Sequence, residues 1–159
     1  MPSISGRHNG RQIRIRVAIV HPDDRNQYDG SSSSFLKNSK TFDALVDTGA
    51  TTTMISPKVV ETMGLIPTGK IPFGSISGEK WHNAYLFHVG FEGEPVPLSE
   101  VQVADPDPAA RWAKVHVYKP IIKGGELPHG TGFDVLLGMD VISTGKLEID
   151  QNGHFSFTF

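Results

Sequence analysis

The sequence predicts a mostly-β fold with one or two short helices. Short runs alternate apolar and polar residues, as in residues 12–20, and this alternation is typical of a strand with one buried face. The 17 glycines and 11 prolines favour short strands and many turns over long helices. A chain of 159 residues with 38% hydrophobic residues fits one domain, 1–159, with a core of its own.

The first half of the chain is expected to hold two strands and a short helix. Ser56 and Pro57 are typical of a helix start, because Ser caps the first turn and Pro suits the first helical position. Gly64 is a typical helix end. The predicted elements are strands over 12–20 and 41–46, a long polar loop over 22–40 and a helix over 57–63.

The second half is expected to hold a long hairpin and a closing hairpin. Tyr85, Phe87 and Val89 stand at every second position of the run 81–91, which predicts that they share one face of a strand and point into the core. The predicted elements are a hairpin over 71–91 with its tip at Gly78-Glu79-Lys80, a strand over 96–103, an insertion over 104–131 with one irregular strand, a buried strand over 133–138, a helix of one or two turns over 139–143, and a closing hairpin of 146–149 and 154–159.

Composition excludes several classes of function. The formal charge of −2 gives no indication of nucleic acid or of an anionic membrane surface as a partner. The chain has no cysteine, and its 7 histidines show no metal-binding spacing, so neither a metal nor another cofactor is expected. The first residues lack an apolar signal core, and no run approaches membrane-spanning length. We therefore expect a cytoplasmic protein.

Residues 43–56 hold the strongest candidate for chemistry. The apolar run 44–46 delivers one carboxylate, Asp47, into a turn made by Thr48 and Gly49. A carboxylate directly after apolar strand residues is expected to be partly buried, and such groups cluster at functional sites. The alternative is structural: Asp47 makes an Asx-type hydrogen bond that only shapes the turn before Gly49.

Two motifs together resemble those of the retropepsin-like aspartic proteases, small single-domain enzymes that work as homodimers. Leu45-Val46-Asp47-Thr48-Gly49-Ala50 is similar to the catalytic signature of that family. The run 133–138, followed by Met139-Asp140-Val141-Ile142, resembles its second signature, two apolar residues and a Gly before a short helix. The hairpin between the two signatures lies where the family carries its flap. The resemblance covers residues 12–20, 41–103 and 132–159.

The resemblance implies a closed barrel with one lobe per chain and half an active site in each. Peptide hydrolysis by carboxylates needs two of them sharing one proton, because like charges at about 3 Å do not both ionise. The chain has one Asp-Thr-Gly, and Asp140 is expected at a helix start. The second carboxylate is therefore expected from Asp47 of another copy across a two-fold axis. The implied activity is endopeptidase action on extended peptides.

The resemblance also implies roles for single residues. Asp47 would act as acid or base in turn, Thr48 would lock the two active-site loops through its hydroxyl, and Gly49 would let the backbone approach the carboxylates. Ala50 offers no hydroxyl to the outer carboxylate oxygen, so we expect activity at mildly acidic or near-neutral pH. The expected flap contacts to substrate are Ile76, Ser77, Gly78 and Trp81, with a packed core position an equal alternative for Trp81.

The sequence departs from the family pattern at four places. The loop at 22–40 and the insertion at 104–131 are longer than the minimal pattern, and the hairpin has fewer glycines than the retroviral flap. The terminal strand 155–159 sits where that family builds its dimer sheet, and it is open to a different pairing between subunits.

Two other classes of function stay open at this point. One is a dimeric β domain that binds peptides or protein partners without turnover. The other is an ATPase, because Val46-Asp47-Thr48-Gly49-Ala50-Thr51 also resembles the Asp-x-Gly-x-Thr phosphate loop of actin-like ATPases. That fold needs a much longer two-domain α/β chain with several helices, which the short strand-rich sequence does not favour.

Overall fold

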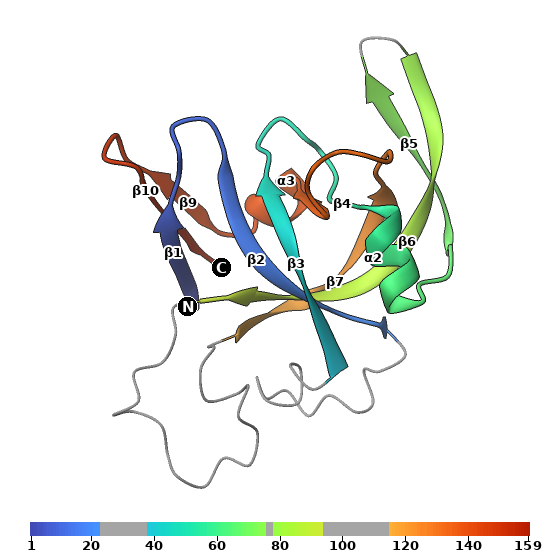
Figure 1. Cartoon of the computed structure of the whole chain (residues 1–159), viewed down its shortest axis with the longest axis horizontal. Coiled ribbons are helices and arrows are strands. Elements are labelled where there is room, and N and C mark those ends of the chain that lie inside the picture. The colour runs from blue at the N-terminus through green and yellow to red at the C-terminus, as the bar shows by residue number, and fades with distance from the viewer. Residues whose placement is uncertain (23–37, 76–77, 94–114) are drawn as a thin grey trace, which may run out of the picture.

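A computed structural model describes residues 1–22, 38–75, 78–93 and 115–159, which form a barrel with a small sheet beside it (Figure 1). The strands are β1 (Ser3–Arg7), β2 (Ile13–Val20), β3 (Ser39–Val46), β4 (Met54–Ile55), β5 (Gly69–Ser75), β6 (Gly78–Glu92), β7 (Val115–Glu126), β8 (Val135–Leu137), β9 (Lys146–Ile149) and β10 (His154–Thr158), and the helices are α2 (Pro57–Met63) and α3 (Met139–Ile142). The predicted mostly-β class is confirmed.

Six strands close the barrel in the order β2–β3–β8–β4–β7–β6, because β6 also pairs with β2. Strand β8 lies between β3, to which it is parallel, and β4, to which it is antiparallel. The chain that joins β3 to β4 must therefore pass over the end of β8. Strand β5 pairs with β6 but is not part of the closed barrel. The second sheet has the strand order β1–β10–β9.

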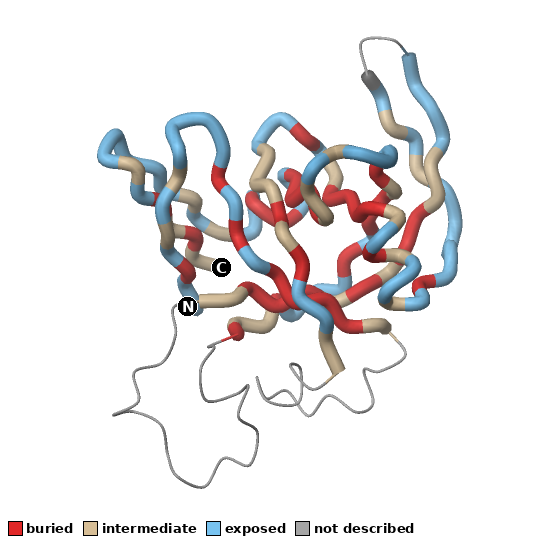
Figure 2. Tube along the Cα trace, viewed as in Figure 1, coloured by how far each residue is buried: buried red, intermediate tan, exposed pale blue. Residues whose placement is uncertain are grey.

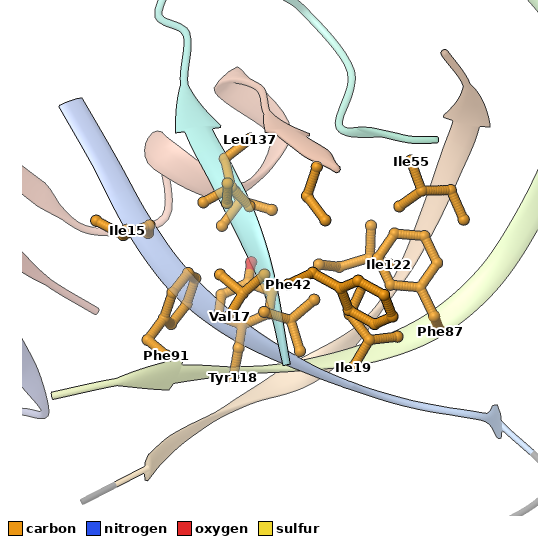
Figure 3. Close-up of a cluster of buried hydrophobic side chains, with 14 of the residues drawn as sticks. Ile15, Val17, Ile19, Phe42, Ile55, Phe87, Phe91, Tyr118, Ile122 and Leu137 are labelled. Carbon is orange, nitrogen blue, oxygen red and sulfur yellow. The ribbon is translucent and has the colours of Figure 1, made fainter. Parts of the chain in front are cut away.

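Alternating apolar residues fill the barrel, as Figure 2 shows by the alternation of buried and exposed segments. Tyr85, Phe87 and Val89 are buried, which confirms their predicted direction. Aliphatic and aromatic side chains of β2, β3, β4, β6, β7 and β8 meet in one cluster (Figure 3). The cluster includes Ile15, Val17, Ile19, Phe42, Ile55, Phe87, Phe91, Tyr118, Ile122 and Leu137.

Helix α2 has the predicted bounds and the predicted ends. The Ser56 side chain accepts a hydrogen bond from the Val59 N–H, and Pro57 occupies the first helical position. Gly64 ends the helix at φ 62°, in the left-handed region that Gly adopts without strain. Val59 is fully buried, so the short helix is held to the barrel by its inward face rather than by its own length.

The structure corrects three expectations. Residues 3–7 form β1, which the sequence did not indicate because four of its five residues are polar or Gly; its pairing with β10 stabilises it. Residues 115–126 of the expected insertion form β7, a barrel strand whose register with β6 shifts between Phe87 and Val89. Gly78 pairs with Ser75 and Lys80 with Phe73, so the predicted tip already belongs to β6.

The described residues do not reach every expected element. The predicted strand at 96–103 lies outside them, as does most of the loop at 22–40. Among the helices that are described, none is long and apolar enough to cross a membrane.

Candidate active site

Asp47 stands at the end of β3, where the chain leaves the barrel wall. Its N–H donates to the Leu137 carbonyl at 2.9 Å, which holds it beside the end of β8. The Gly49 N–H donates to Asp47 Oδ1 at 2.8 Å, and a Cβ at Gly49 would lie 3.1 Å from that oxygen. The side chain is half-buried, as predicted. The Asx-type hydrogen bond is present, and it also fixes the direction of the carboxylate.

The loop from Asp47 to Thr53 is tied to the start of α3 through its backbone. The Met139 N–H donates to the Ala50 carbonyl at 2.8 Å, and the Asp140 N–H donates to the Thr51 carbonyl at 3.1 Å. These two N–H groups belong to the first turn of α3 and have no partner within the helix. The loop thus supplies acceptors that the helix start needs, and the helix start in turn fixes the loop.

Thr53 and Asp140 form a second link, which the sequence did not indicate. Thr53 is fully buried, and its N–H lies 3.0 Å from both carboxylate oxygens of Asp140. Its hydroxyl donates to Asp140 Oδ1 at 2.7 Å and accepts from the Gly138 N–H at 3.1 Å. Asp140 lies on α3, as expected, and its carboxylate is engaged in positioning this loop. The only available signal was an Asp in the first turn of a predicted helix.

Gly138 is required because the loop passes directly against it. A Cβ at this position would lie 2.6 Å from the Thr52 carbonyl carbon and 3.0 Å from the Ala50 oxygen. Both are backbone atoms, so no side-chain rotation relieves the contact. The Gly of the second motif therefore allows the Asp47 loop to cross the end of β8.

The hairpin of β5 and β6 extends away from the barrel beside this loop (Figure 1). Ile76 and Ser77, two of the expected flap residues, lie outside the described residues. Trp81 pairs with Pro72 and is 65% exposed, so the alternative of a packed core Trp is wrong. Opposed residues of antiparallel strands share a face, and Trp81 therefore lies on the opposite face from Phe73.

The other face of the hairpin meets the Asp47 loop. Phe73 packs against an apolar cluster made by Ala50, Met54, Leu127 and Leu136. His82 lies on the same face, with its ring 5.9 Å from that of Phe73 in an edge-on contact. Sequence reasoning missed Phe73. Alternation along β5 shows which of its residues share a face, but only the register with β6 shows which residues of β6 lie on that same face.

A concavity of about 440 Å³ opens on another side of Asp47. Asp47 and Thr48 line it together with His8 and Arg11 from the turn between β1 and β2, and with Ile149 from β9. Thr48 is exposed, and its hydroxyl makes no hydrogen bond within the described part of the chain. No group of three His, Asp or Glu side chains suited to a metal ion occurs among the described residues.

The profile of the aspartyl protease family matches residues 34–141, which hold the first motif and the second motif as far as Val141. The chain belongs to the aspartyl protease family. It also resembles the crystal structure of a retropepsin-like aspartic protease from Rickettsia conorii, with a TM-score of 0.56 and 15% identity over 98% of this chain and 90% of that one. At this identity the likeness shows the fold, which is retropepsin-like. No curated protein matches the sequence.

Asp47, Thr48 and Gly49 all lie in the loop fixed against α3. The structure brings this loop together with Phe73 of the hairpin and with the concavity, but it does not bring Trp81 to it. The mostly-β barrel also excludes the actin-like ATPase, whose two-domain α/β fold is different.

Proposed function

We propose that this aspartyl protease is an endopeptidase whose active site forms between two copies of the chain. The observation that carries the proposal is one carboxylate, Asp47, held at a fixed direction by the Gly49 N–H on a loop that α3 fixes. Preorganised groups of this kind are what transition-state stabilisation needs. Membership of the family and the retropepsin-like fold support the same chemistry.

The two Asp47 carboxylates act as a pair that shares one proton. The ionised Asp47 takes a proton from water, which attacks the scissile carbonyl carbon, while the protonated Asp47 donates to the carbonyl oxygen. The Gly49 N–H stabilises the charged form of the carboxylate that it contacts. The exposed hydroxyl of Thr48 is free within the described chain to bond across the two-fold axis.

The substrate is an extended peptide that lies between the Asp47 loop and the hairpin, in backbone hydrogen bonds with the hairpin. We assign the cleft-facing side of the hairpin to Phe73 and His82 on its described part, with Ile76, Ser77 and Gly78 as the proposed tip contacts. Ala50, Met54 and Leu136 make the floor beside Asp47 apolar. Apolar side chains flanking the cleaved bond are therefore expected.

The pH range of activity follows from the donors around the carboxylate. Asp47 Oδ1 accepts from the Gly49 N–H, and Ala50, which is buried, adds no hydroxyl donor. Because no hydroxyl at position 50 stabilises the ionised carboxylate, cleavage is expected at mildly acidic or near-neutral pH. A rate profile that peaks only below about pH 3 would contradict this.

The test is cleavage of a mixed peptide library at several pH values by wild type, Asp47→Asn and Glu61→Gln. Glu61 lies exposed on α2, so its variant controls for the change from carboxylate to amide. We expect Asp47→Asn to lose nearly all cleavage and keep its circular dichroism spectrum, and Glu61→Gln to cleave like wild type. Peptide binding without cleavage by wild type would instead support the non-catalytic peptide-binding β domain.

A further inference from the structure

The chain holds two Asn-Gly pairs, in two turns that lie side by side (Figure 1). Asn9-Gly10 lies in the turn between β1 and β2, and Asn152-Gly153 lies in the turn between β9 and β10. Both Asn are exposed. Both Gly have a positive φ, 78° at Gly10 and 85° at Gly153. The two pairs are therefore matched in sequence, exposure and backbone conformation, and they differ in their hydrogen bonds.

An Asn followed by Gly loses ammonia without the help of an enzyme. The backbone nitrogen of the Gly attacks Cγ of the Asn side chain, and Gly permits this close approach because it has no Cβ. A C–N bond forms, the amide nitrogen leaves as ammonia together with the proton of the attacking N–H, and a succinimide ring results. Water then opens the ring to aspartate or to isoaspartate, in which the backbone runs through the side chain. Nothing is oxidised or reduced.

The structure holds Asn9-Gly10 in hydrogen bonds that oppose this reaction. Asn9 Oδ1 accepts from the Arg11 N–H at 3.0 Å and from the Gln12 N–H at 2.8 Å. The Gly10 N–H donates to His8 Nδ1 at 3.0 Å. For the attack, the carboxamide must rotate out of its two bonds and the Gly10 N–H must leave the His8 ring. The reactive geometry therefore requires a local opening of the turn that breaks these bonds.

Asn152-Gly153 lacks both of these restraints. Within the described part of the chain, neither the Asn152 carboxamide nor the Gly153 N–H makes a hydrogen bond. The Asn152 N–H donates to Asp150 Oδ1 at 2.8 Å, and the Gly153 carbonyl accepts from the His8 N–H at 2.8 Å. These bonds hold the backbone on either side of the pair, and the carboxamide keeps its rotation toward the Gly153 nitrogen.

We propose that Asn152 is a site of spontaneous deamidation, at which the folded chain is converted to aspartate and isoaspartate while Asn9 is protected. The co-reactant is water. The inference goes beyond the proposed function and does not depend on it, because the reaction involves neither Asp47 nor a substrate.

Deamidation at Asn152 changes a turn that supports one side of the candidate site. The product adds a carboxylate two residues from that of Asp150, and like charges repel each other. Isoaspartate also lengthens the backbone of the turn. The Gly153 carbonyl accepts from the His8 N–H, and His8 Nε2 lies 2.9 Å from the Asp150 carbonyl oxygen. Because His8 lines the concavity beside Asp47, the modification loosens this side of the site.

The first test follows wild-type protein by peptide-mapping mass spectrometry during incubation at neutral pH, folded and unfolded in urea. Cleavage after Lys and Arg places the two Asn in separate peptides, 8–11 and 147–159. In the folded chain we expect Asn152 to be converted at least about tenfold faster than Asn9, because only Asn9 must first give up hydrogen bonds. In urea the two rates should converge. Equal rates in the folded chain, or no conversion of Asn152 there, would overturn the proposal.

The second test compares wild type with Asn152→Gln after the same incubation. Gln keeps the amide but must form a larger ring, so the 147–159 peptide of this variant should keep its mass. We expect aged wild type to melt at a lower temperature than fresh wild type, and aged Asn152→Gln to melt like its fresh sample. An aged Asn152→Gln that loses as much stability as aged wild type would overturn the consequence assigned to this turn.

Discussion

The Asp47–Thr53 loop and the β5–β6 hairpin belong to the same candidate site but are held in opposite ways. The loop is fixed by backbone bonds to Met139 and Asp140 and by the buried Thr53. The outer part of the hairpin is held by its own strand pairing, with Trp81 exposed on one face. A catalytic group needs a fixed position, whereas a segment that covers the substrate must open for release. The predictions below test this contrast.

Gly138→Ala should have the largest effect. The added Cβ meets the backbone of Thr52 and Ala50, so the loop must shift. We expect the unfolding free energy to fall by about 3 kcal/mol and peptide cleavage to be lost. Gly74→Ala in the hairpin is the matched control, because a Cβ there meets nothing within 4 Å. Urea denaturation of both variants measures the difference. Equal midpoints would show that the loop is not rigidly packed on β8.

Thr53→Val should have the next largest effect. Val keeps the shape of Thr but leaves the buried Gly138 N–H without its acceptor and removes a donor to Asp140. An unsatisfied buried group costs about 2 kcal/mol. Thr41→Val, at an exposed position of β3, should change stability little. Urea denaturation and cleavage rates check both, and an unchanged Thr53→Val would mean that the loop is held by its backbone bonds alone.

Phe73→Ala and Trp81→Ala compare the two faces of the hairpin. Phe73 packs on the cluster beside Asp47, so its loss should raise the KM for peptide by about tenfold, equivalent to about 1.4 kcal/mol. Trp81 lies on the other face, and we expect its variant to stay within about twofold of wild type. Steady-state kinetics decide between them. A larger rise in KM for Trp81→Ala than for Phe73→Ala would show that the substrate contacts the face of the hairpin that carries Trp81.

Asp150→Asn should have the smallest effect, on the turn between β9 and β10. The His154 N–H, and after it the Asn152 N–H, donate to this carboxylate and lower its pKa. A lowered pKa means that the stabilisation is present above the unfolded-state pKa, about 4, and is lost as pH falls through the folded-state value. The melting temperature of Asp150→Asn should therefore lie below that of wild type at pH 7 and approach it in acid. A difference in melting temperature between wild type and Asp150→Asn that grows in acid would contradict this prediction.

The sequence by itself determined the local elements and the position of the carboxylate. The caps at Ser56 and Gly64 fixed α2, and the alternation at Tyr85, Phe87 and Val89 fixed the inward face of β6. Asp47 between an apolar run and Thr48-Gly49 was found from its neighbours alone. These features depend on residues close together in the chain, where backbone sterics and periodicity act directly.

Only the tertiary structure decided what those elements contact. Thr53 and Asp140 stand 87 positions apart, and their bond exists because β8 enters the barrel between β3 and β4. The same holds for β1, which needs β10 beside it, and for Phe73, whose face follows from the register of β5 with β6. Such contacts depend on strand order and register. A shift of one residue in the register would move every side chain of a strand to the other face of the sheet.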